Sequence, residues 1–253
     1  MLGVERRNAI LALLNEKRSV LVPELAQMFA VTEETIRRDL KHLESKGVLY
    51  RTHGGAVLTD DTKIEAPLEI REGINVTGKD AIGRYAAGLV EDYDTIFLDA
   101  STSALYVAKH IKDKKGLTVI TNAERIIFEL SGVQDITLIC SGGSLRKSSL
   151  SYVGRHTEDA IKNYFANKLF FSCKGFSPKR GLTDSNEQES EIRKTMLQCS
   201  EKVVFLCDHT KFDKVGFVQT AKVEDVDLII IDSAPPAEWD EFLSENASKM
   251  IQI

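Results

Sequence analysis

The stretch TEETIRRDLKHLESKGVLYRTHGGAVL, residues 32–58, decides how the first part of the chain folds. Its first half predicts a helix that begins after Thr32, because a threonine side chain can cap the free N–H groups of a first turn. Apolar side chains then recur at the spacing of one buried helix face, at Ile36, Leu40 and Leu43. The second half alternates weakly in polarity around Gly54-Gly55, which indicates a hairpin. A helix followed by a basic, glycine-tipped hairpin is what a winged helix-turn-helix requires, with one element for the groove of DNA and one for the flanking backbone.

Two further helices are predicted in front of this stretch. Residues 4–16 place apolar side chains at helical spacing, and residues 22–29 form a short helix with Pro23 near its start, where a missing N–H costs nothing. Ala30-Val31 is the turn that joins this helix to the next. Residues 1–58 are therefore predicted to form a winged helix-turn-helix domain that binds double-stranded DNA.

Two adjacent arginines, Arg37 and Arg38, lie on the outer face of the third helix. Because a helix turns by about 100° per residue, both cannot aim at one base, so we expect one on base edges and the other on phosphate. We expect DNA contacts from the helix and the hairpin, at Thr32, Glu34, Thr35, Arg37, Arg38, Lys41, Arg51, His53 and Gly54. The alternative is that the arginines only form a solvated helix face, paired with Glu33, Glu34 or Glu44.

The composition is that of a globular protein with an uneven charge. The chain has 253 residues, of which 43% are apolar and 28% are charged, and its net charge is −5. Residues 1–58 hold nine Lys and Arg against seven Asp and Glu, a charge of +2, so the remainder carries −7. A mildly basic first part suits a protein that touches DNA with one end only. No apolar run approaches the ~18 residues of a membrane span and the N-terminus is no signal peptide, so we expect a cytoplasmic protein with no membrane partner.

A different periodicity follows residues 59–72, which are predicted to be a linker; residues 59–70 are polar and show no clear element. Strands are expected at 94–98, 117–120, 136–140, 168–172, 203–207 and 228–231, and helices at 75–91, 102–112, 122–131, 152–165 and 187–199. Such alternation is typical of a mostly parallel, doubly wound sheet. The predicted fold class is α+β multidomain, with the winged helix-turn-helix followed by a larger, Rossmann-like α/β domain at 73–253. The length alone would also fit one large α/β domain.

Polar turns follow three of the predicted strands, at 99–103, at 141–144 with Arg146 close behind, and at 208–212. Ligands of open α/β sheets collect at the carboxyl ends of the strands, so the three turns are expected to share one pocket. Hydroxyls and N–H groups at a helix start can hold phosphate, and carboxylates and lysines suit a phosphorylated sugar or polyol. The first turn alone is equally well explained as an ordinary Ser or Thr N-cap.

The chain resembles the DeoR family of bacterial sugar-metabolism regulators. Arg6, Ile10 and Leu14 at four-residue steps, TEETIRRDL at 32–40 and HGGA at 53–56 match the DNA-binding domain of that family at its own spacing. Residues 65–240 are similar to the family's effector domain, which has the fold of ribose-5-phosphate isomerase and CoA transferases. The resemblance implies a ligand-controlled transcription factor. Since half-sites must be spaced geometrically, a homodimer or homotetramer is expected.

The resemblance also implies where the effector binds. Residues 101–103 would bind phosphate, and Glu189 and Lys211 would line the sugar site. Together with the turns described above, the expected effector site comprises Asp99, Ser101, Thr102, Ser103, Gly142, Gly143, Arg146, Lys174, Glu189, Asp208 and Lys211. We expect the effector to be a phosphorylated sugar, with no cofactor and no metal.

Two loops depart from the family pattern. The glycine of the phosphate loop is Ser101 here and its last threonine is Ser103, while the family's Gly-Ala-Asp-Gly is Ser-Cys-Lys-Gly at 172–175. In the isomerases that aspartate belongs to the catalytic site, so Lys174 leaves no obvious base and argues against isomerase chemistry. Lys174 either tunes which sugar phosphate is accepted or is a surface lysine whose ammonium reaches solvent.

Two other functions stay open beside a regulator. A sugar-phosphate isomerase or transferase with an accessory DNA-binding domain would have the same fold, because fold alone does not choose function. A thiol redox sensor would use Cys173 or Cys207, although nothing in the sequence indicates a lowered thiol pKa. The four cysteines show no metal-ligand spacing. The expected function is transcriptional control of a sugar-catabolism operon, with repression as the commoner family mode and activation still open, and not an enzyme.

Overall fold

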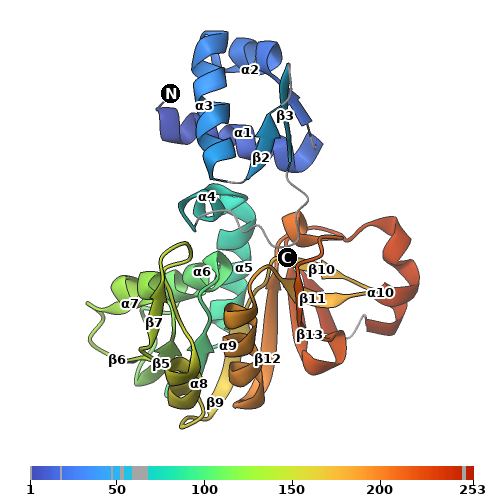
Figure 1. Cartoon of the computed structure of the whole chain (residues 1–253). Coiled ribbons are helices and arrows are strands. Elements are labelled where there is room, and N and C mark those ends of the chain that lie inside the picture. The colour runs from blue at the N-terminus through green and yellow to red at the C-terminus, as the bar shows by residue number, and fades with distance from the viewer. Residues whose placement is uncertain (1, 18, 47, 52–53, 59–67, 247–248) are drawn as a thin grey trace. The chain divides into compact units, whose positions relative to one another are not determined.

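The computed structural model describes residues 2–17, 19–46, 48–51, 54–58, 68–246 and 249–253 (Figure 1). The chain divides into two compact units, Met1–Asn75 and Val76–Ile253. Each unit has its own hydrophobic core. No helix among the described residues is long and apolar enough to cross a membrane.

The first unit combines helices with a small antiparallel sheet. Its helices are α1 (Gly3–Lys17), α2 (Val22–Phe29), α3 (Glu33–Ser45) and α4 (Leu68–Gly73), and its strands are β1 (Ser19–Leu21), β2 (Leu49–Arg51) and β3 (Gly55–Leu58). The strand order is β1-β3-β2, so the wing formed by β2 and β3 pairs with the strand between α1 and α2. Residues of α1, α2, α3 and all three strands share one core. The predicted winged helix-turn-helix is confirmed.

Helix α3 begins where the sequence predicts. The Thr32 hydroxyl accepts a hydrogen bond from the Thr35 N–H at 3.3 Å. Before it, Ala30 ends α2 in a left-handed conformation with a φ of 51°. The inner face of α3 is buried in the core, at Ile36, Leu40 and Leu43. The opposite face is therefore the one that can meet DNA.

A buried carboxylate, which helix periodicity does not predict, joins α3 to α1. Asp39 accepts hydrogen bonds from Arg6 Nε at 2.6 Å and from Arg7 Nη1 at 3.3 Å. Because a buried carboxylate is costly unless it is paired, these arginines hold α1 in place against α3.

The wing lies close to β1 because β3 starts with a glycine. A Cβ atom on Gly55 would lie 1.9 Å from the carbonyl oxygen of Val20, which is too close for any side chain. Beside this contact, the Val22 N–H donates to the Gly54 carbonyl at 2.9 Å. Gly55 thus permits the approach that ties the wing to the helices.

The second unit is built on a parallel sheet. Its strands are β4 (Thr95–Leu98), β5 (Leu117–Thr121), β6 (Ile136–Cys140), β9 (Ala166–Phe171), β12 (Ser200–Cys207), β14 (Leu228–Ile231) and β15 (Met250–Gln252). They have the order β15-β14-β12-β9-β4-β5-β6, and every neighbouring pair is parallel. The predicted mostly parallel sheet is confirmed.

Helices cover both faces of this sheet. One core joins the sheet to α5 (Val76–Gly88), α6 (Thr102–His110) and α7 (Glu124–Leu130), and the other joins it to α8 (Arg155–Ile161), α9 (Glu187–Gln198) and α10 (Asp240–Asn246). Side chains of one strand alternate between the two cores. In β4, Ile96 and Leu98 belong to the first core and Phe97 to the second. Burial on both faces explains why the strands are apolar without polar alternation.

Shorter strands were not predicted. They form an antiparallel sheet of β10 (Gly175–Ser177), β11 (Gly181–Asp184) and β13 (Val218–Ala221), and a hairpin of β7 (Ser144–Arg146) and β8 (Ser151–Val153). Three or four residues contain too few alternations to reveal a strand by period. The helix predicted at 152–165 is wrong in its first part, because β8 occupies it and Gly154, with a φ of 94°, separates β8 from α8.

The segment predicted to be without regular structure contains a helix at its end. α4 starts at Leu68, which is buried, and ends at Gly73 beside the Asn8 side chain of α1. Residues 59–67 lie outside the described residues.

Replacing Leu40 by Ala tests the packing of α3. Leu40 is fully buried, so the variant should lose about 2–5 kcal/mol of unfolding free energy. Urea unfolding followed by far-UV circular dichroism measures this loss, while the fluorescence of Trp239, the single tryptophan, reports on the second unit. The exposed neighbour is the control, and Lys41→Ala should change stability by less than about 0.5 kcal/mol. A wild-type unfolding curve for Leu40→Ala would contradict this packing.

Candidate functional site

The two arginines on the outer face of α3 are paired with glutamates one turn earlier. Arg37 Nη2 lies 2.6 Å from Glu33 Oε2, and Arg38 Nε lies 3.5 Å from Glu34 Oε1. More than half of each arginine side chain is nevertheless exposed. Exposed pairs of this kind contribute only about 0.2–1 kcal/mol, so a phosphate or a base edge can replace the glutamate. The pairing weighed as an alternative thus exists for Glu33 and Glu34, and it leaves both arginines accessible to DNA.

The other predicted contacts of α3 lie on the same exposed face. The hydroxyls of Thr32 and Thr35 are 2.9 Å apart at the start of the helix, and Lys41 is exposed one turn further on. Their contacts with DNA stay a prediction.

On the wing, Arg51 is anchored to α3. Its Nε donates to Glu44 Oε2 at 2.6 Å and its backbone N–H donates to Oε1 at 3.1 Å. These hydrogen bonds lower the pKa of Glu44. Gly54 is exposed at the tip, and His53 lies outside the described residues. Arg51 therefore sets the position of the wing, and its predicted contact with DNA stays a prediction.

In the second unit, the turn after β4 leads into the start of α6. The Ser101 hydroxyl accepts a hydrogen bond from the Ala104 N–H at 3.1 Å, and Asp99 Oδ1 accepts one from the Ser101 N–H at 3.2 Å. Ser101 therefore has the N-cap role that the sequence left open. Thr102 is buried, and the buried Ser103 hydroxyl has no hydrogen-bond partner among the described residues.

Arg193 of α9 is the centre of the site, although the sequence does not single it out. Its Nε donates to Asp99 Oδ2 at 2.7 Å, its Nη1 to Asp184 Oδ2 at 2.9 Å and its Nη2 to Glu189 Oε2 at 3.4 Å. All four side chains are almost fully buried. One signal was present, because Arg193 follows Glu189 by four residues and shares its helix face. The two aspartates come from distant segments, so their contact could not be predicted from spacing.

Burial and ion pairing act in opposite directions within this cluster. Burial raises the pKa of Asp99, and the nearby charge of Arg193 offsets this only in part. Burial opposes the charged form of Arg193, but the charges of Asp184, Asp99 and Glu189 outweigh it and raise the pKa of the guanidinium. Three carboxylates around one cation leave an excess of negative charge, which a second cation can compensate.

Arg146 supplies that second cation. Its Nη1 lies 3.3 Å from Glu189 Oε1 and donates to Ser149 Oγ at 2.8 Å. Ser151 Oγ also donates to Glu189 Oε1, at 2.7 Å. The structure thus brings together three of the predicted residues: Asp99 and Glu189 through Arg193, and Arg146 through Glu189.

Gly142 and Gly143 shape the turn after β6. Both have left-handed φ values, 62° and 114°. A Cβ atom on Gly143 would lie 2.0 Å from Thr157 Oγ1, and that hydroxyl donates to the Gly142 carbonyl at 2.7 Å. Packing against α8 accounts for Gly143 and the positive φ accounts for Gly142, and their predicted contact with an effector stays a prediction.

The turn after β12 holds a buried ion pair. Lys211 Nζ donates to Asp208 Oδ2 at 2.6 Å, and the Thr210 N–H donates to Oδ1 at 3.1 Å. Burial alone would raise the pKa of Asp208, but the charges of Lys211 and of Lys79 in α5 hold it well below its usual range. Asp208 in turn raises the pKa of Lys211 against the effect of burial. Both groups therefore stay charged inside the protein.

Cys173 lies between the Arg193 cluster and this ion pair. After burial, the charges that act on its thiol are those of Asp184, Arg193 and Lys211. Burial raises the pKa of Cys173 to about 12, and it also raises the pKa of Cys207. Because the thiolate is the reactive form, both cysteines are unsuited to a thiol redox sensor. Lys174 beside it is half-buried, and its contact with an effector stays a prediction.

The site is therefore a set of fixed charges at the carboxyl edge of the sheet. Each of its carboxylates Asp99, Asp184, Glu189 and Asp208 is held by a cation. The protein's own side chains therefore hold this arrangement of charges in place. Among the described residues, no group of three or more His, Cys, Asp or Glu side chains could hold a metal ion.

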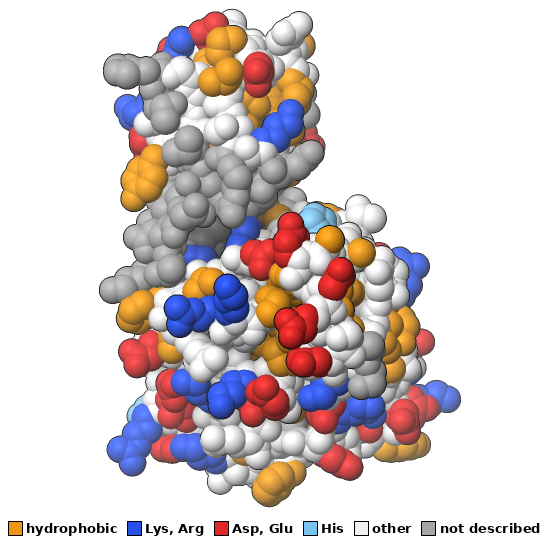
Figure 2. Space-filling model, turned by 90° about the vertical axis from the view of Figure 1, so that its right-hand side faces the viewer, with side chains coloured by type: hydrophobic (Ala, Val, Ile, Leu, Met, Phe, Trp, Pro, Cys, Tyr) orange, Lys and Arg blue, Asp and Glu red, His pale blue; other side chains and the backbone are white. Residues whose placement is uncertain are grey.

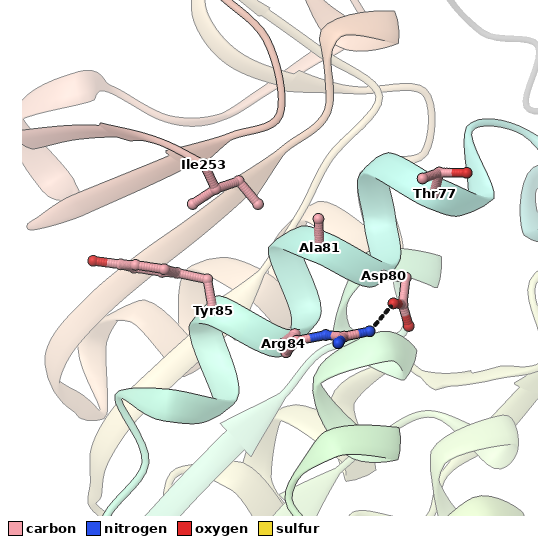
Figure 3. A pocket seen from close by; sticks show the side chains of 6 residues that line it. All are labelled: Thr77, Asp80, Ala81, Arg84, Tyr85 and Ile253. Atoms are coloured by element: carbon pink, nitrogen blue, oxygen red, sulfur yellow. Dashed lines mark hydrogen bonds and ion pairs between the residues drawn. The ribbon is translucent and has the colours of Figure 1, made fainter.

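A separate hollow lies on the outer side of α5, beside the end of β15. Its volume is about 630 Å³, and it is lined by Thr77, Asp80, Ala81, Arg84, Tyr85 and Ile253 (Figure 3). Asp80 is paired there with Arg84 at 2.7 Å and with His110 at 2.8 Å. None of the predicted effector residues lines it.

Comparison with known proteins agrees with both units. The model of the DeoR-like helix-turn-helix domain matches residues 6–62, and that of the DeoR C terminal sensor domain matches residues 74–233. At a TM-score of 0.39 and 13% identity, ribose 5-phosphate isomerase from Plasmodium falciparum covers 55% of this chain and 54% of its own, a likeness on which no argument rests.

Curated relatives match along nearly the whole chain. The uncharacterized HTH-type transcriptional regulator YulB of Bacillus subtilis is 42% identical and covers 92% of this chain and 90% of its own length. The HTH-type transcriptional regulator GolR of Listeria innocua is 36% identical, with 92% of both chains covered. The transcriptional repressor AccR of Agrobacterium fabrum is 33% identical over 90% of this chain and 89% of its own. These names agree with the expectation that the chain is not an enzyme, and the chain belongs to the DeoR family of transcriptional regulators.

Proposed function

We propose that this regulator represses a sugar-catabolism operon and that a phosphorylated sugar, bound at the carboxyl edge of the parallel sheet, relieves the repression. The names of relatives support the class of operon and the sign. One is the L-fucose operon activator of Haemophilus influenzae, and two are the transcriptional repressors AccR of Agrobacterium fabrum and GlcR of Bacillus subtilis. Repression is the more frequent of the two modes among these three.

One observation carries the effector half of this proposal. The Ser103 hydroxyl, in the first turn of α6, is buried and has no hydrogen-bond partner within the described segments. The first N–H groups of a helix have no partner inside it, and the positive end of the helix dipole favours an anion. A phosphate group would accept hydrogen bonds from both kinds of donor. The adjacent Asp99 is paired with Arg193, which reduces its repulsion of that anion.

The first unit supplies the output. It presents the exposed arginines of α3 and the wing for the groove and the backbone of an operator. On the face of the second unit visible in Figure 2, acidic and basic side chains are interspersed. The net charge of −7 outside residues 1–58 is what suits contact with DNA through the first unit. Repeated half-sites then call for a homodimer or a homotetramer.

The charged site supports a sensor better than an enzyme. Proton transfer needs a base that is free to take a proton, whereas Asp208 is held by Lys211 and the three remaining carboxylates by Arg193. The family pattern that residues 172–175 resemble has an aspartate where this chain has Lys174, so that loop supplies no carboxylate base. A regulator needs only to bind its effector at the carboxyl edge of the sheet and does not need to convert it.

Arg37→Ala and Arg38→Ala test the DNA-binding face. Replacing the arginine that contacts a base should weaken DNA binding by about 1–3 kcal/mol. Replacing the arginine that contacts phosphate should reduce the slope of log affinity against log salt concentration by about 1. Fluorescence anisotropy with the DNA upstream of the regulator's own operon, at several salt concentrations, separates the two roles. The matched control is Arg155→Ala, which breaks an exposed pair of the same spacing with Asp159 on α8. Unchanged DNA affinity in both α3 variants would show that Arg37 and Arg38 do not contact the operator.

A thermal-shift screen of phosphorylated sugars tests the effector. A true effector at 100 times its dissociation constant should add about 2.7 kcal/mol of stability. The double substitution Thr102→Val and Ser103→Ala should remove that gain, while Ser101 is kept because it caps α6. Ser131→Ala, which removes an exposed hydroxyl at the end of α7, should respond like the wild type. Stabilisation that survives in the double variant would move the phosphate away from α6.

A further inference from the structure

The turn from β5 into the start of α7 holds two acceptor atoms to which no group of the described residues donates a hydrogen bond. Within the part of the chain that the structure describes, Asn122 Oδ1 and Glu124 Oε2 are buried and have no hydrogen-bond partner. Such atoms are rare in folded proteins, because each gives up its hydrogen bonds to water on folding. Two of them within three residues indicate a place where another molecule supplies the donors.

The orientation of Asn122 is fixed by β8. Its Nδ2 donates to the Tyr152 carbonyl at 3.0 Å, and the Tyr152 N–H donates to the Asn122 carbonyl at 2.8 Å. Because a carbonyl can only accept, the amide nitrogen must face Tyr152 and Oδ1 must point away from it. The strand thus holds the unfilled acceptor in one orientation before anything binds.

Asn122 lies at the same edge of the sheet as the proposed phosphate site. Leu98 at the end of β4 is paired with Thr121 at the end of β5, so Asp99 and Asn122 follow two adjacent strand ends. The Thr121 hydroxyl donates to the Leu98 carbonyl at 2.7 Å and fastens these ends together. Ser103, with its own unpartnered hydroxyl, is in the first turn of the helix that follows β4.

The two turns differ in their chemistry. Asn122 Oδ1 and the Glu124 carboxylate only accept hydrogen bonds, and Glu124 is negatively charged, so this side takes hydroxyls and repels phosphate. The start of α6 offers N–H donors, the Ser103 hydroxyl and the positive end of a helix dipole, which suit phosphate. A molecule that satisfies both turns carries a phosphate at one end and hydroxyls at the other.

From this arrangement we propose that the turn between β5 and α7 is a hydroxyl-binding subsite, in which Asn122 Oδ1 and Glu124 Oε2 each accept a hydrogen bond from a hydroxyl of a polyhydroxylated phosphate ester. The inference rests on the proposed function, because it requires a sugar phosphate at this edge. In this proposal, Asn122 and Glu124 select among sugar phosphates, and the start of α6 binds the phosphate group.

The experiment compares two kinds of probe on the full chain. Isothermal calorimetry measures the dissociation constants of inorganic phosphate and of a panel of pentose and hexose phosphates with their deoxy analogues. The test variants are Asn122→Ala and Glu124→Ala. The matched control is Glu129→Ala, which removes a partly buried carboxylate of the same helix that is paired with Lys112. Asn122→Ala also loses its bond to Tyr152, whereas Glu124→Ala keeps it and tests the subsite even if Asn122→Ala does not fold.

In the wild type, at least one sugar phosphate should bind more tightly than inorganic phosphate. Each test variant should raise the dissociation constant of that sugar phosphate by about 3- to 10-fold, which corresponds to one lost hydrogen bond. Binding of inorganic phosphate, and every constant of Glu129→Ala, should stay at the wild-type value. A deoxy analogue that lacks the hydroxyl bound by Asn122 should bind the wild type and Asn122→Ala equally well.

Two results overturn the subsite in different ways. If both test variants bind the sugar phosphate as the wild type does, or lose inorganic phosphate to the same extent, the subsite is wrong and the proposed function stands. If no sugar phosphate of the panel binds the wild type more tightly than inorganic phosphate, the proposed function fails and the subsite fails with it.

Discussion

The second unit depends on one buried guanidinium. Arg193 reaches Asp99 after β4, Asp184 at the end of β11 and Glu189 on its own helix, so it joins the turn after β4 to a segment that lies more than 80 residues later in the sequence. A buried charge is tolerated only when it is paired and hydrogen-bonded, and this pairing must be complete for each of the four groups. The loops at the carboxyl edge of the sheet are therefore held by electrostatics as much as by the apolar cores beneath them. That is why the site is formed before a ligand arrives.

The same physics appears on a smaller scale in the first unit. Asp39 is buried against Arg6 and Arg7, and these ion pairs join the first helix to the one that presents the arginines predicted to contact DNA. The exposed pairs of Arg37 and Arg38 on the other side of α3 are of a different kind, because water and DNA can both replace the glutamates. Burial thus separates the ion pairs that build the structure from those that can be exchanged.

Periodicity was enough to predict the main elements. The caps and the apolar spacing of α3, and the long apolar strands of the parallel sheet, carry their signal within a few residues of sequence. Short strands such as β7 and β8 do not, and the helix expected at 152–165 was wrong because Gly154 breaks it. Within the site, the polar turns after β4 and β12 could be predicted, since each is local. Arg193, Asp184 and Asn122 could not, because what makes them part of the site is a contact between distant segments or a missing contact, and neither leaves a local pattern.

The close approach of Gly55 to β1 has a consequence for regulation. The wing is anchored to the strand between α1 and α2, while Arg51 anchors it to α3, so no element that meets DNA is attached at one point only. The described strands of the wing are therefore fixed both to the small sheet and to α3. If two copies bind neighbouring half-sites as proposed, an effector would change operator occupancy by altering the spacing and orientation of whole DNA-binding units, and not the shape of their binding surface.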